Sequence, residues 1–291
     1  MEHKSMKQVN KALSALIVVV TIAIVLYLAL GVAMPAFSAS KLLALVTRTG
    51  TPSPPPGEAI PLKPIADLTS LNATVKLDVN GLINGERAQG DLNIDLTTND
   101  QGKSRISITG PLLGELAAQV GGSLVGLFTP SSVDIYKVPQ GTYIVVNSLL
   151  PLCIKPQESK ATAALDEMSP ESLLGMLTGS DVARGKLVGQ EKLNGVPVKH
   201  YLINGDAFLA AAQKSSDPKL KAFSEALWAA EDADLYIDAK DGTPLAFLGG
   251  FSGTYEPLKF EGDFDVQVEL TGVNTNTAVN LPSVCNKPIS P

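Results

Sequence analysis

The chain has 291 residues, of which 45% are hydrophobic and 18% are charged, so the composition excludes a wholly disordered protein. Its formal net charge of −6 excludes an extended basic surface of the kind that binds nucleic acids. Two histidines and two cysteines leave almost no ligands for a His/Cys metal cluster, and we expect neither a metal nor a cofactor.

The N-terminal region contains one long apolar stretch at residues 12–34, ALSALIVVVTIAIVLYLALGVAM. At about 1.5 Å per residue, a helix of this length spans the roughly 30 Å hydrocarbon core of a bilayer. Three lysines in residues 1–11 favour a cytoplasmic tail by the positive-inside rule. We therefore predict a transmembrane helix or signal anchor over residues 12–36. The rest of the chain would then lie outside the cell membrane, in the periplasm or at the cell surface.

A cleaved signal peptide is the alternative for this region. Ala36-Phe37-Ser38 and Ser38-Ala39-Ser40 have the small-x-small pattern of signal-peptidase sites. The apolar stretch is longer than the usual span of about 7–15 residues in a signal peptide, which favours a retained anchor. Both interpretations export the following domain.

A proline-rich stalk is expected at residues 37–66, with six prolines after Gly50. Such a composition gives a stiff, extended spacer between a bilayer and a domain. Removing the acid and three lysines of the N-terminal tail leaves 20 basic and 28 acidic residues, a charge of −8. This charge favours solubility and disfavours adhesion to anionic lipid headgroups.

Alternating apolar and polar residues predict half-buried antiparallel strands. Residues 71–79 have Leu, Ala, Val, Leu and Val on one face, and the same alternation recurs at 92–96, 235–237 and 264–270. Asn84-Gly85, Asn194-Gly195 and Asp241-Gly242 are signals for tight turns between strands. This spacing predicts nine to eleven strands.

Four helical patterns interrupt the strands. Pro111 begins the first, in which apolar residues recur every four positions through 112–128 while glycines lower the helix propensity. Ser169-Pro170 begins the second, and Asp206 can cap the third. The fourth starts at Asp217-Pro218 and carries Leu220, Phe223, Leu227 and Trp228. The order of elements predicts an α+β domain whose helices gather on one face of the sheet.

Few residues could support catalysis. His200 is the one histidine of the exported region and is expected to be a hydrogen-bonded structural residue on a strand. Asp234 and Asp238 fit the solvated side of a strand, and the alternative is a carboxylate cluster formed with Asp232. No nucleophile elbow, phosphate-binding loop or zinc-protease motif occurs in the sequence. We therefore expect a protein that is not an enzyme.

Cys153 and Cys285 are an even pair in an exported chain, and each lies in a similar Leu-Pro context before a Lys. A disulfide is favoured in an oxidising compartment, with two free buried thiols as the alternative. The bond would tie the end of the chain to its middle.

Two stretches resemble a known family. The segment VGQEKLNGVPVKHY at residues 188–201 resembles a hairpin of the LppX/LprAFG lipoproteins, and LYIDAKDGTP at residues 235–244 resembles another of their hairpins. The strand-helix-strand order is also similar to that of the wider LolA-like set. The resemblance implies a LolA/LppX-like domain over residues 67–291. Its fold would be a large curved antiparallel sheet, a half-barrel, with helices covering the concave face.

Members of that family hold acyl chains of lipids or lipoproteins between sheet and helices and move them through the cell envelope. They are usually lipidated on a cysteine just after the signal peptide, whereas the first cysteine here is Cys153. The resemblance therefore implies a lipid-binding protein whose anchor is the N-terminal helix rather than a lipid.

The leading functional interpretation is a membrane-tethered protein that binds lipids or other amphiphiles in envelope transport. Seven residues on the apolar sides of the predicted helices would line its cavity: Leu116, Val120, Leu124, Leu173, Leu177, Phe223 and Leu227. A packed core would use the same residues. The alternative function is a sensory or protein-interaction ectodomain in envelope regulation, which would act through a partner membrane protein.

Overall fold

The computed structural model describes residues 57–63, 68–83, 85–114, 130–156, 183–216, 218–255, 260–275 and 277–289. Its strands are β1 (Glu58–Ala59), β2 (Leu71–Ile83), β3 (Glu86–Thr98), β4 (Ser104–Thr109), β5 (Ser132–Val138), β6 (Gly141–Asn147), β7 (Leu152–Ile154), β8 (Arg184–Leu193), β9 (Val196–Ile203), β10 (Leu227–Ala230), β11 (Ala233–Asp238), β12 (Pro244–Tyr255) and β13 (Phe260–Val273). The helices are α6 (Gly205–Ala212), α7 (Pro218–Ala226) and the 3₁₀ turn η5 (Ser283–Asn286).

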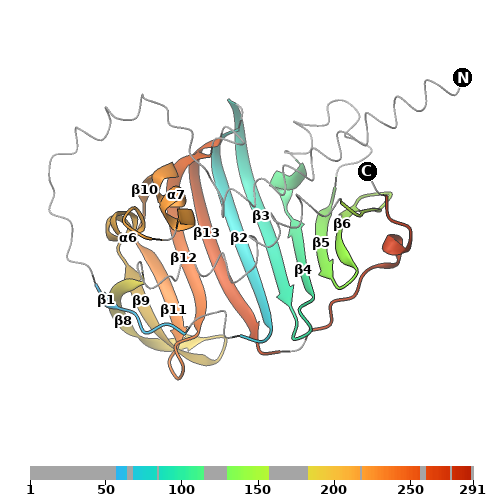
Figure 1. Ribbon diagram of the computed structural model, residues 1–291. Helices are drawn as coiled ribbons and strands as arrows, with labels where there is room; N and C mark the ends of the chain where they lie inside the picture. The colour runs from blue at the N-terminus through green and yellow to red at the C-terminus, as the bar shows by residue number, and fades with distance from the viewer. Residues whose placement is uncertain are drawn as a thin grey trace, which may run out of the picture.

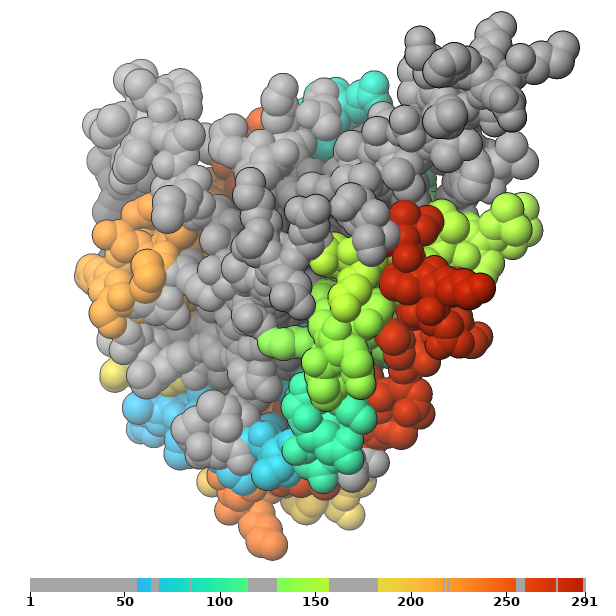
Figure 2. Space-filling model, turned by 45° about the vertical axis from the view of Figure 1, so that its right-hand side comes forward, coloured from blue at the N-terminus to red at the C-terminus, as the bar shows by residue number. Residues whose placement is uncertain are grey.

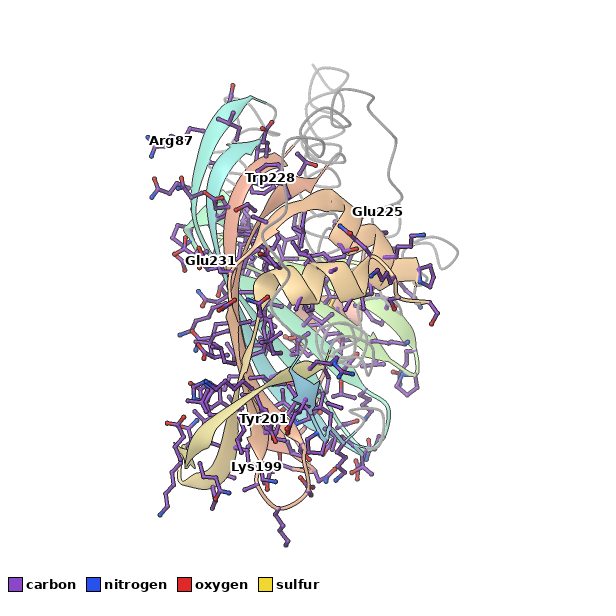
Figure 3. All side chains as sticks on the ribbon, turned by 90° about the vertical axis from the view of Figure 1, so that its left-hand side faces the viewer. Arg87, Lys199, Tyr201, Glu225, Trp228 and Glu231 are labelled. Carbon is purple, nitrogen blue, oxygen red and sulfur yellow. A yellow bond between two sulfur atoms is a disulfide. The ribbon has the colours of Figure 1, made fainter. Side chains whose placement is uncertain are left out.

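These strands form one open sheet in the order β1-β8-β9-β11-β12-β13-β2-β3-β4-β5-β6-β7, and β10 pairs with β12 outside this path. The pairs of neighbouring strands are antiparallel, as predicted. The sheet is curved, and α6 and α7 lie on one side of it (Figures 1 and 3). We call that side the inner face and the opposite side the outer face.

The predicted alternation accounts for the long strands. In β2, Leu71, Ala73, Val75, Leu77 and Val79 are buried, and the residues between them are exposed or half-buried. The two-residue turn between β8 and β9 has φ of 51° at Asn194 and 85° at Gly195. Positive φ at both central residues is the geometry that lets a two-residue turn follow the twist of a hairpin. Three strands that lack an alternating pattern, β1, β7 and β10, take the number of described strands beyond the predicted range.

Two details of the helical prediction are wrong. Asn204, not Asp206, caps α6, because its side chain accepts a hydrogen bond from the amide of Ala207, while Asp206 lies in the first turn. The following helix ends at Ala226, so Leu227 and Trp228 belong to strand β10. Pairing of β10 with β12 satisfies the backbone groups there, which a longer helix would have used internally.

Residues 57–63, within the range predicted as a stalk, lie along the margin of the sheet. Glu58 and Ala59 pair with β8, and the amide of Lys63 donates to the carbonyl of Gly242 at 2.9 Å. Among the described residues, none of the helices has the length and hydropathy needed to cross a membrane. The predicted helix at 12–34 lies outside the described residues.

The end of the chain crosses the outer face of the last strands. Cys153 of β7 and Cys285 of η5 form the predicted disulfide. Around it, Tyr136, Tyr143, Val145 and Val279 form a second apolar cluster, separate from the main core. Figure 2 shows the C-terminal residues, in red, against the yellow-green segment that contains β5 to β7. We call residues 277–289 the C-terminal strap.

Candidate ligand-binding face

The inner face of the sheet is apolar from one end to the other. Inward-facing side chains from ten strands join one buried cluster with residues of α6 and α7. Among the most deeply buried are Leu71, Ile83, Leu96, Val133, Ile203, Leu235, Ile237 and Phe247. An apolar side chain buried in this way stabilises the fold by about 1.5–3 kcal/mol, so this face is the principal source of stability.

Aromatic rings gather where the two helices meet the sheet. Phe223 of α7 lies 5.6 Å from Phe251 of β12 in an edge-on arrangement, and Phe208 of α6 lies 6.1 Å from the same ring. Phe251 stacks on Phe264 of β13 at 5.5 Å, and Phe260 packs edge-on against Phe264 at 6.4 Å. We call these five residues the aromatic cluster. Phe223 and Phe264 are only half-buried, so the cluster retains apolar surface that is open to contact.

The structure brings two of the seven predicted lining residues to this place. Phe223 belongs to the aromatic cluster, and Leu227 lies on β10 against Gly253 of β12. The other five, Leu116, Val120, Leu124, Leu173 and Leu177, lie outside the described residues. The strand members of the cluster were not predicted as lining residues, although Phe260 and Phe264 share a face four positions apart.

Small residues form a row across the inner face beside the aromatic cluster. Gly253, Gly262, Gly81 and Ala88 are directly opposite one another on β12, β13, β2 and β3. A Cβ on Gly81 would lie 2.5 Å from the carbonyl oxygen of Glu261 and 2.8 Å from the ring of Phe260. The absence of side chains at Gly81 and Gly262 therefore lets β2 and β13 approach closely and leaves room for the Phe260 ring over the backbone. We call this row the glycine row.

The first predicted helix begins on the same face. Residues 111–114 are helical, and Leu112 and Leu113 are completely buried. A Cβ on Gly90 of β3 would lie 3.5 Å from Leu112, so this helical turn rests directly on the sheet. The remainder of the predicted helix, to residue 128, lies outside the described residues. The apolar segment that follows thus starts from the inner face.

The outer face is polar and carries a hollow of about 590 Å³. Three of its carboxylates, Asp265, Asp78 and Asp91, are directly opposite one another on β13, β2 and β3. Glu231 also lines the hollow, and in Figure 3 it lies on the opposite side of the sheet from Glu225 of α7. Like charges in register are destabilising, and Lys76 is the one cation in the lining. The charged lining makes this hollow unsuited to an acyl chain.

His200 of β9 lies beside this hollow and is hydrogen-bonded, as predicted. Its Nε2 lies 2.6 Å from Asp234, its Nδ1 lies 3.2 Å from Glu191, and its ring stacks on Tyr236 at 4.5 Å. Burial, followed by the charges of Asp234 and Glu191, raises the pKa of Tyr236 above its ordinary value. These contacts join β8, β9 and β11. In the part of the chain that the structure describes, no group of three histidine, cysteine or carboxylate side chains could hold a metal ion.

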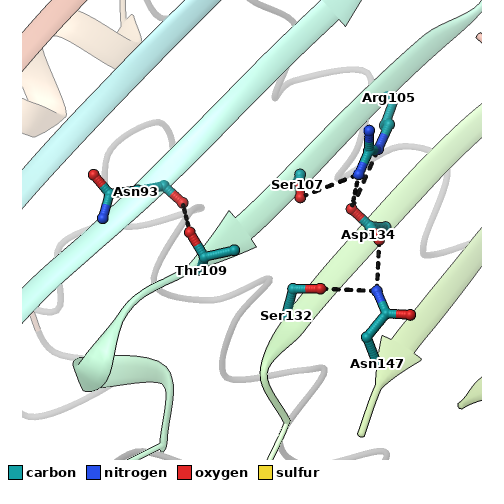
Figure 4. A network of polar contacts seen from close by, with 7 residues as sticks. All are labelled: Asn93, Arg105, Ser107, Thr109, Ser132, Asp134 and Asn147. Atoms are coloured by element: carbon teal, nitrogen blue, oxygen red, sulfur yellow. Dashed lines mark hydrogen bonds and ion pairs between the residues drawn. The ribbon is translucent and has the colours of Figure 1, made fainter.

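A second polar network lies on the outer face of β3 to β6 (Figure 4). The buried carboxylate of Asp134 accepts hydrogen bonds from Arg105 at 2.9 Å and from Asn147 at 2.7 Å. Burial lowers the pKa of Arg105, but the hydrogen bond and charge of Asp134 outweigh this effect, so the net pKa is raised. Burial, together with the charge of Asp134, raises the pKa of Tyr136. The network satisfies a buried charge and thereby stabilises these strands.

A scan against protein-family models finds no match for this chain, and a search of curated proteins finds none either. Among solved structures, the chain is similar to LprF from Mycobacterium bovis, with 11% identity, a TM-score of 0.41 and coverage of 74% of this chain and 90% of that one. LprF is one of the LprAFG proteins that the two hairpins resemble.

Two further solved structures are similar. A DUF1329 family protein from Desulfovibrio piger has 9% identity and a TM-score of 0.24, covering 73% of this chain and 88% of that one. An outer membrane lipoprotein-sorting protein domain from Vibrio parahaemolyticus has 8% identity and a TM-score of 0.22, covering 72% of this chain and 87% of that one.

Proposed function

We propose that this protein is a membrane-tethered, extracytoplasmic binding protein for lipids or other amphiphiles, without catalytic activity, which takes part in lipid or lipoprotein transport in the cell envelope. The observation that carries the proposal is the aromatic cluster between the helices and the inner face. Phe223, Leu227 and Phe264 are apolar side chains that remain half-buried at that junction. Covering their surface with an acyl chain would gain roughly 25 cal/mol for each Å² removed from water.

The helices α6 and α7, which lie over the inner face, support ligand binding in preference to a permanently closed core. The two described helices are short, and α7 contacts the sheet mainly through Leu220 and Phe223. The segment from Pro111 onward begins on the inner face and contains glycines that weaken a helix. A short helix with few buried contacts, such as α7, opens more readily than core strands, which suits a cover that admits a ligand.

The disulfide supports the extracytoplasmic location. Disulfides form and persist in oxidising compartments and are rare in the cytosol. Export agrees with the apolar stretch at residues 12–34, which would also provide the tether. A net charge of −8 after the first 40 residues keeps the domain soluble beside the membrane.

The first experiment is native mass spectrometry of the purified protein, followed by extraction and identification of bound lipid. The second is uptake of a fluorescent acyl lipid by Phe223→Ala, with Leu248→Ala as the control on the outer face of β12. We expect Phe223→Ala to weaken uptake about tenfold, because a lost apolar contact of about 1.4 kcal/mol has that effect. Leu248→Ala should leave uptake unchanged. Absence of lipid from the native protein together with no uptake would contradict the proposal.

The hollow on the outer face supports a second candidate, a protein-interaction ectodomain in envelope regulation. Its carboxylates on β2, β3 and β13 would complement a cationic segment of a partner membrane protein. Asp78→Asn with Asp265→Asn would then abolish capture of that partner and leave lipid uptake intact. Loss of lipid uptake in this double variant would contradict the separation of the two faces.

A further inference from the structure

The turn between β6 and β7 presents two leucines to solvent. Leu149 and Leu150 have 84% and 67% of their surface exposed, the largest fractions among the large apolar side chains that the structure describes. Residues 141–154, which contain this turn, include no charged side chain. We call Leu149 and Leu150 the leucine tip. Exposed apolar residues gathered at one point mark a contact site more often than single scattered ones.

The leucine tip is held in a defined shape. The hydroxyl of Ser148 donates to the carbonyl of Leu150 at 2.9 Å and accepts from the amide of the same residue at 3.3 Å. Pro151 follows and restricts the backbone. Cys153, two residues later, is bonded to Cys285 of the C-terminal strap. The two leucines are thus presented by a fixed turn rather than by a loose loop.

The strand register places this tip beside both ends of the segment 111–129. Thr109, Ser132 and Asn147 are directly opposite one another on β4, β5 and β6. The chain leaves β4 through Gly110 to the helical residues 111–114, and returns at Ser131, whose amide donates to the carbonyl of Asn147 at 2.8 Å. The leucine tip follows Asn147 by two residues. It therefore lies at the same end of these strands as residues 111–114, the helical turn that begins on the inner face.

We propose that the leucine tip inserts into the surface of a lipid bilayer and thereby holds the domain against the membrane from which it takes up or releases its ligand. This inference rests on the proposed function. A tether to the same membrane raises the effective concentration of the domain at the bilayer surface. The weak insertion of two leucines then suffices to hold the domain there, although it would not bind an untethered domain. The uncharged turn enters lipid without the cost of burying a charge.

The size of the tip favours lipid over a protein partner. Even large aromatic side chains bury only about 150–250 Å² each, so two leucines fall well short of the roughly 800 Å² that each partner gives to a stable interface. Binding to a second copy of this chain, or to an unrelated protein, is the alternative that the experiment below would detect.

The test uses the full chain reconstituted in phosphatidylcholine vesicles that contain brominated lipids. Trp228 is the one tryptophan of the chain, so a Trp228→Phe background gives a silent reference. Leu150→Trp in this background should be quenched strongly by the brominated lipid. Val188→Trp, at a site on β8 with 56% exposure, is the matched control and should be quenched weakly. Equal quenching at both positions overturns the proposal.

The second readout is transfer of a fluorescent acyl lipid from these vesicles to the domain. The double variant Leu149→Ser, Leu150→Ser should slow this transfer, by about tenfold for each of the two lost leucines. The control Val188→Ser should not slow it. Uptake from detergent micelles, which needs no bilayer contact, should be unchanged in all variants. Association of the native chain that depends on its concentration and is lost in the double variant would instead assign the tip to a second copy.

Failure of the two proposals is distinguishable. If the native chain takes up no lipid from micelles or vesicles, the proposed function fails, whatever the quenching shows. If uptake from micelles is normal and the leucine variants transfer lipid from vesicles at the native rate, the leucine tip is not a membrane contact and lipid binding stands.

Discussion

Single charged side chains tie the margin of the sheet to a hairpin. Nζ of Lys63 lies 2.9 Å from Oδ2 of Asp241, in the turn between β11 and β12. This contact, followed by hydrogen bonding from Thr243, whose amide donates to Oδ1 of Asp241 at 3.0 Å, lowers the pKa of Asp241 from 3.8 to about 2. Since the folded pKa lies below the ordinary value, the contact stabilises the fold fully above pH 3.8. The stabilisation is lost as the pH falls toward 2.

Replacing Lys63 therefore changes the titration of Asp241. In Lys63→Met we expect the pKa of Asp241 to rise toward its ordinary value, because the first cause of its depression is removed. Lys63→Arg keeps a cation at this place and should keep the pKa low. A pH titration of the Asp241 carboxyl carbon by NMR measures both. A pKa that stays near 2 in Lys63→Met would show that hydrogen bonding from Thr243 is sufficient.

The start of α6 depends on one side chain. Asn204 accepts from the amide of Ala207 at 3.0 Å and donates to Asp232 at 2.9 Å, so it joins the helix to the turn before β11. Asn204→Ala should lower the free energy of unfolding by about 0.5–2 kcal/mol, the usual effect of losing an N-cap.

Asp206→Ala is the control, because Asp206 is only a first-turn carboxylate. Its loss should cost about 0.3–1 kcal/mol. Urea denaturation of the two variants ranks them. A larger loss in Asp206→Ala would restore the cap predicted from the sequence.

At the scale of elements, Gly81 and Gly262 of the glycine row allow β2 and β13 to approach closely at one level. Gly81→Ala would place a Cβ against the backbone of β13 and the Phe260 ring, and we expect a loss of about 1–3 kcal/mol in unfolding free energy. Gly189→Ala on β8 is the matched control, since a Cβ there has no neighbour within 4 Å. It should be neutral or stabilise by about 0.4–1 kcal/mol. Equal chemical denaturation midpoints for the two variants would exclude close packing as the reason for Gly81.

The long strands and their turns could be predicted because alternation and Asn-Gly or Asp-Gly pairs are local signals. Strand β10 could not, since Leu227 and Trp228 also continue the spacing of the preceding helix, and only pairing with β12 decides between the two. The choice of Asn204 over Asp206 has the same origin. Both are good caps, and the place where the chain leaves β9 selects one.

The candidate site was predicted only in part, for a related reason. Phe223 and Leu227 were predicted from helical spacing. In the fold they lie on α7 and β10, and tertiary contacts place both against β12. Phe251, Phe260 and Phe264 joined them through strand register, which a sequence does not reveal. The outer-face hollow is likewise lined by residues that are far apart in the sequence. Lys76 of β2 and Gln267 of β13, for example, are nearly 200 residues apart and lie directly opposite each other.

At the scale of the whole molecule, the two faces of the sheet have different roles. The inner face holds the main core and the aromatic cluster, while the C-terminal strap covers the outer face of β5 to β7. The Cys153–Cys285 bond fastens that strap across a sequence separation of 132 residues. The strap therefore contributes to stability from the side opposite the proposed ligand.

Removing the disulfide should separate stability from ligand binding. A loop of this length is worth about 5 kcal/mol in the chain-entropy account, and we expect Cys153→Ser to lower the free energy of unfolding by about 2–5 kcal/mol. Cys285→Ser and the double variant should show the same loss, because either single change already breaks the bond. Uptake of a fluorescent acyl lipid, measured well below the lowered melting temperature, should stay at the native level. Peptide mapping without reduction gives the direct check, since recovery of both cysteines alkylated would mean that no bond exists. A loss of lipid uptake that matches the loss of stability would show that the strap also shapes the inner face.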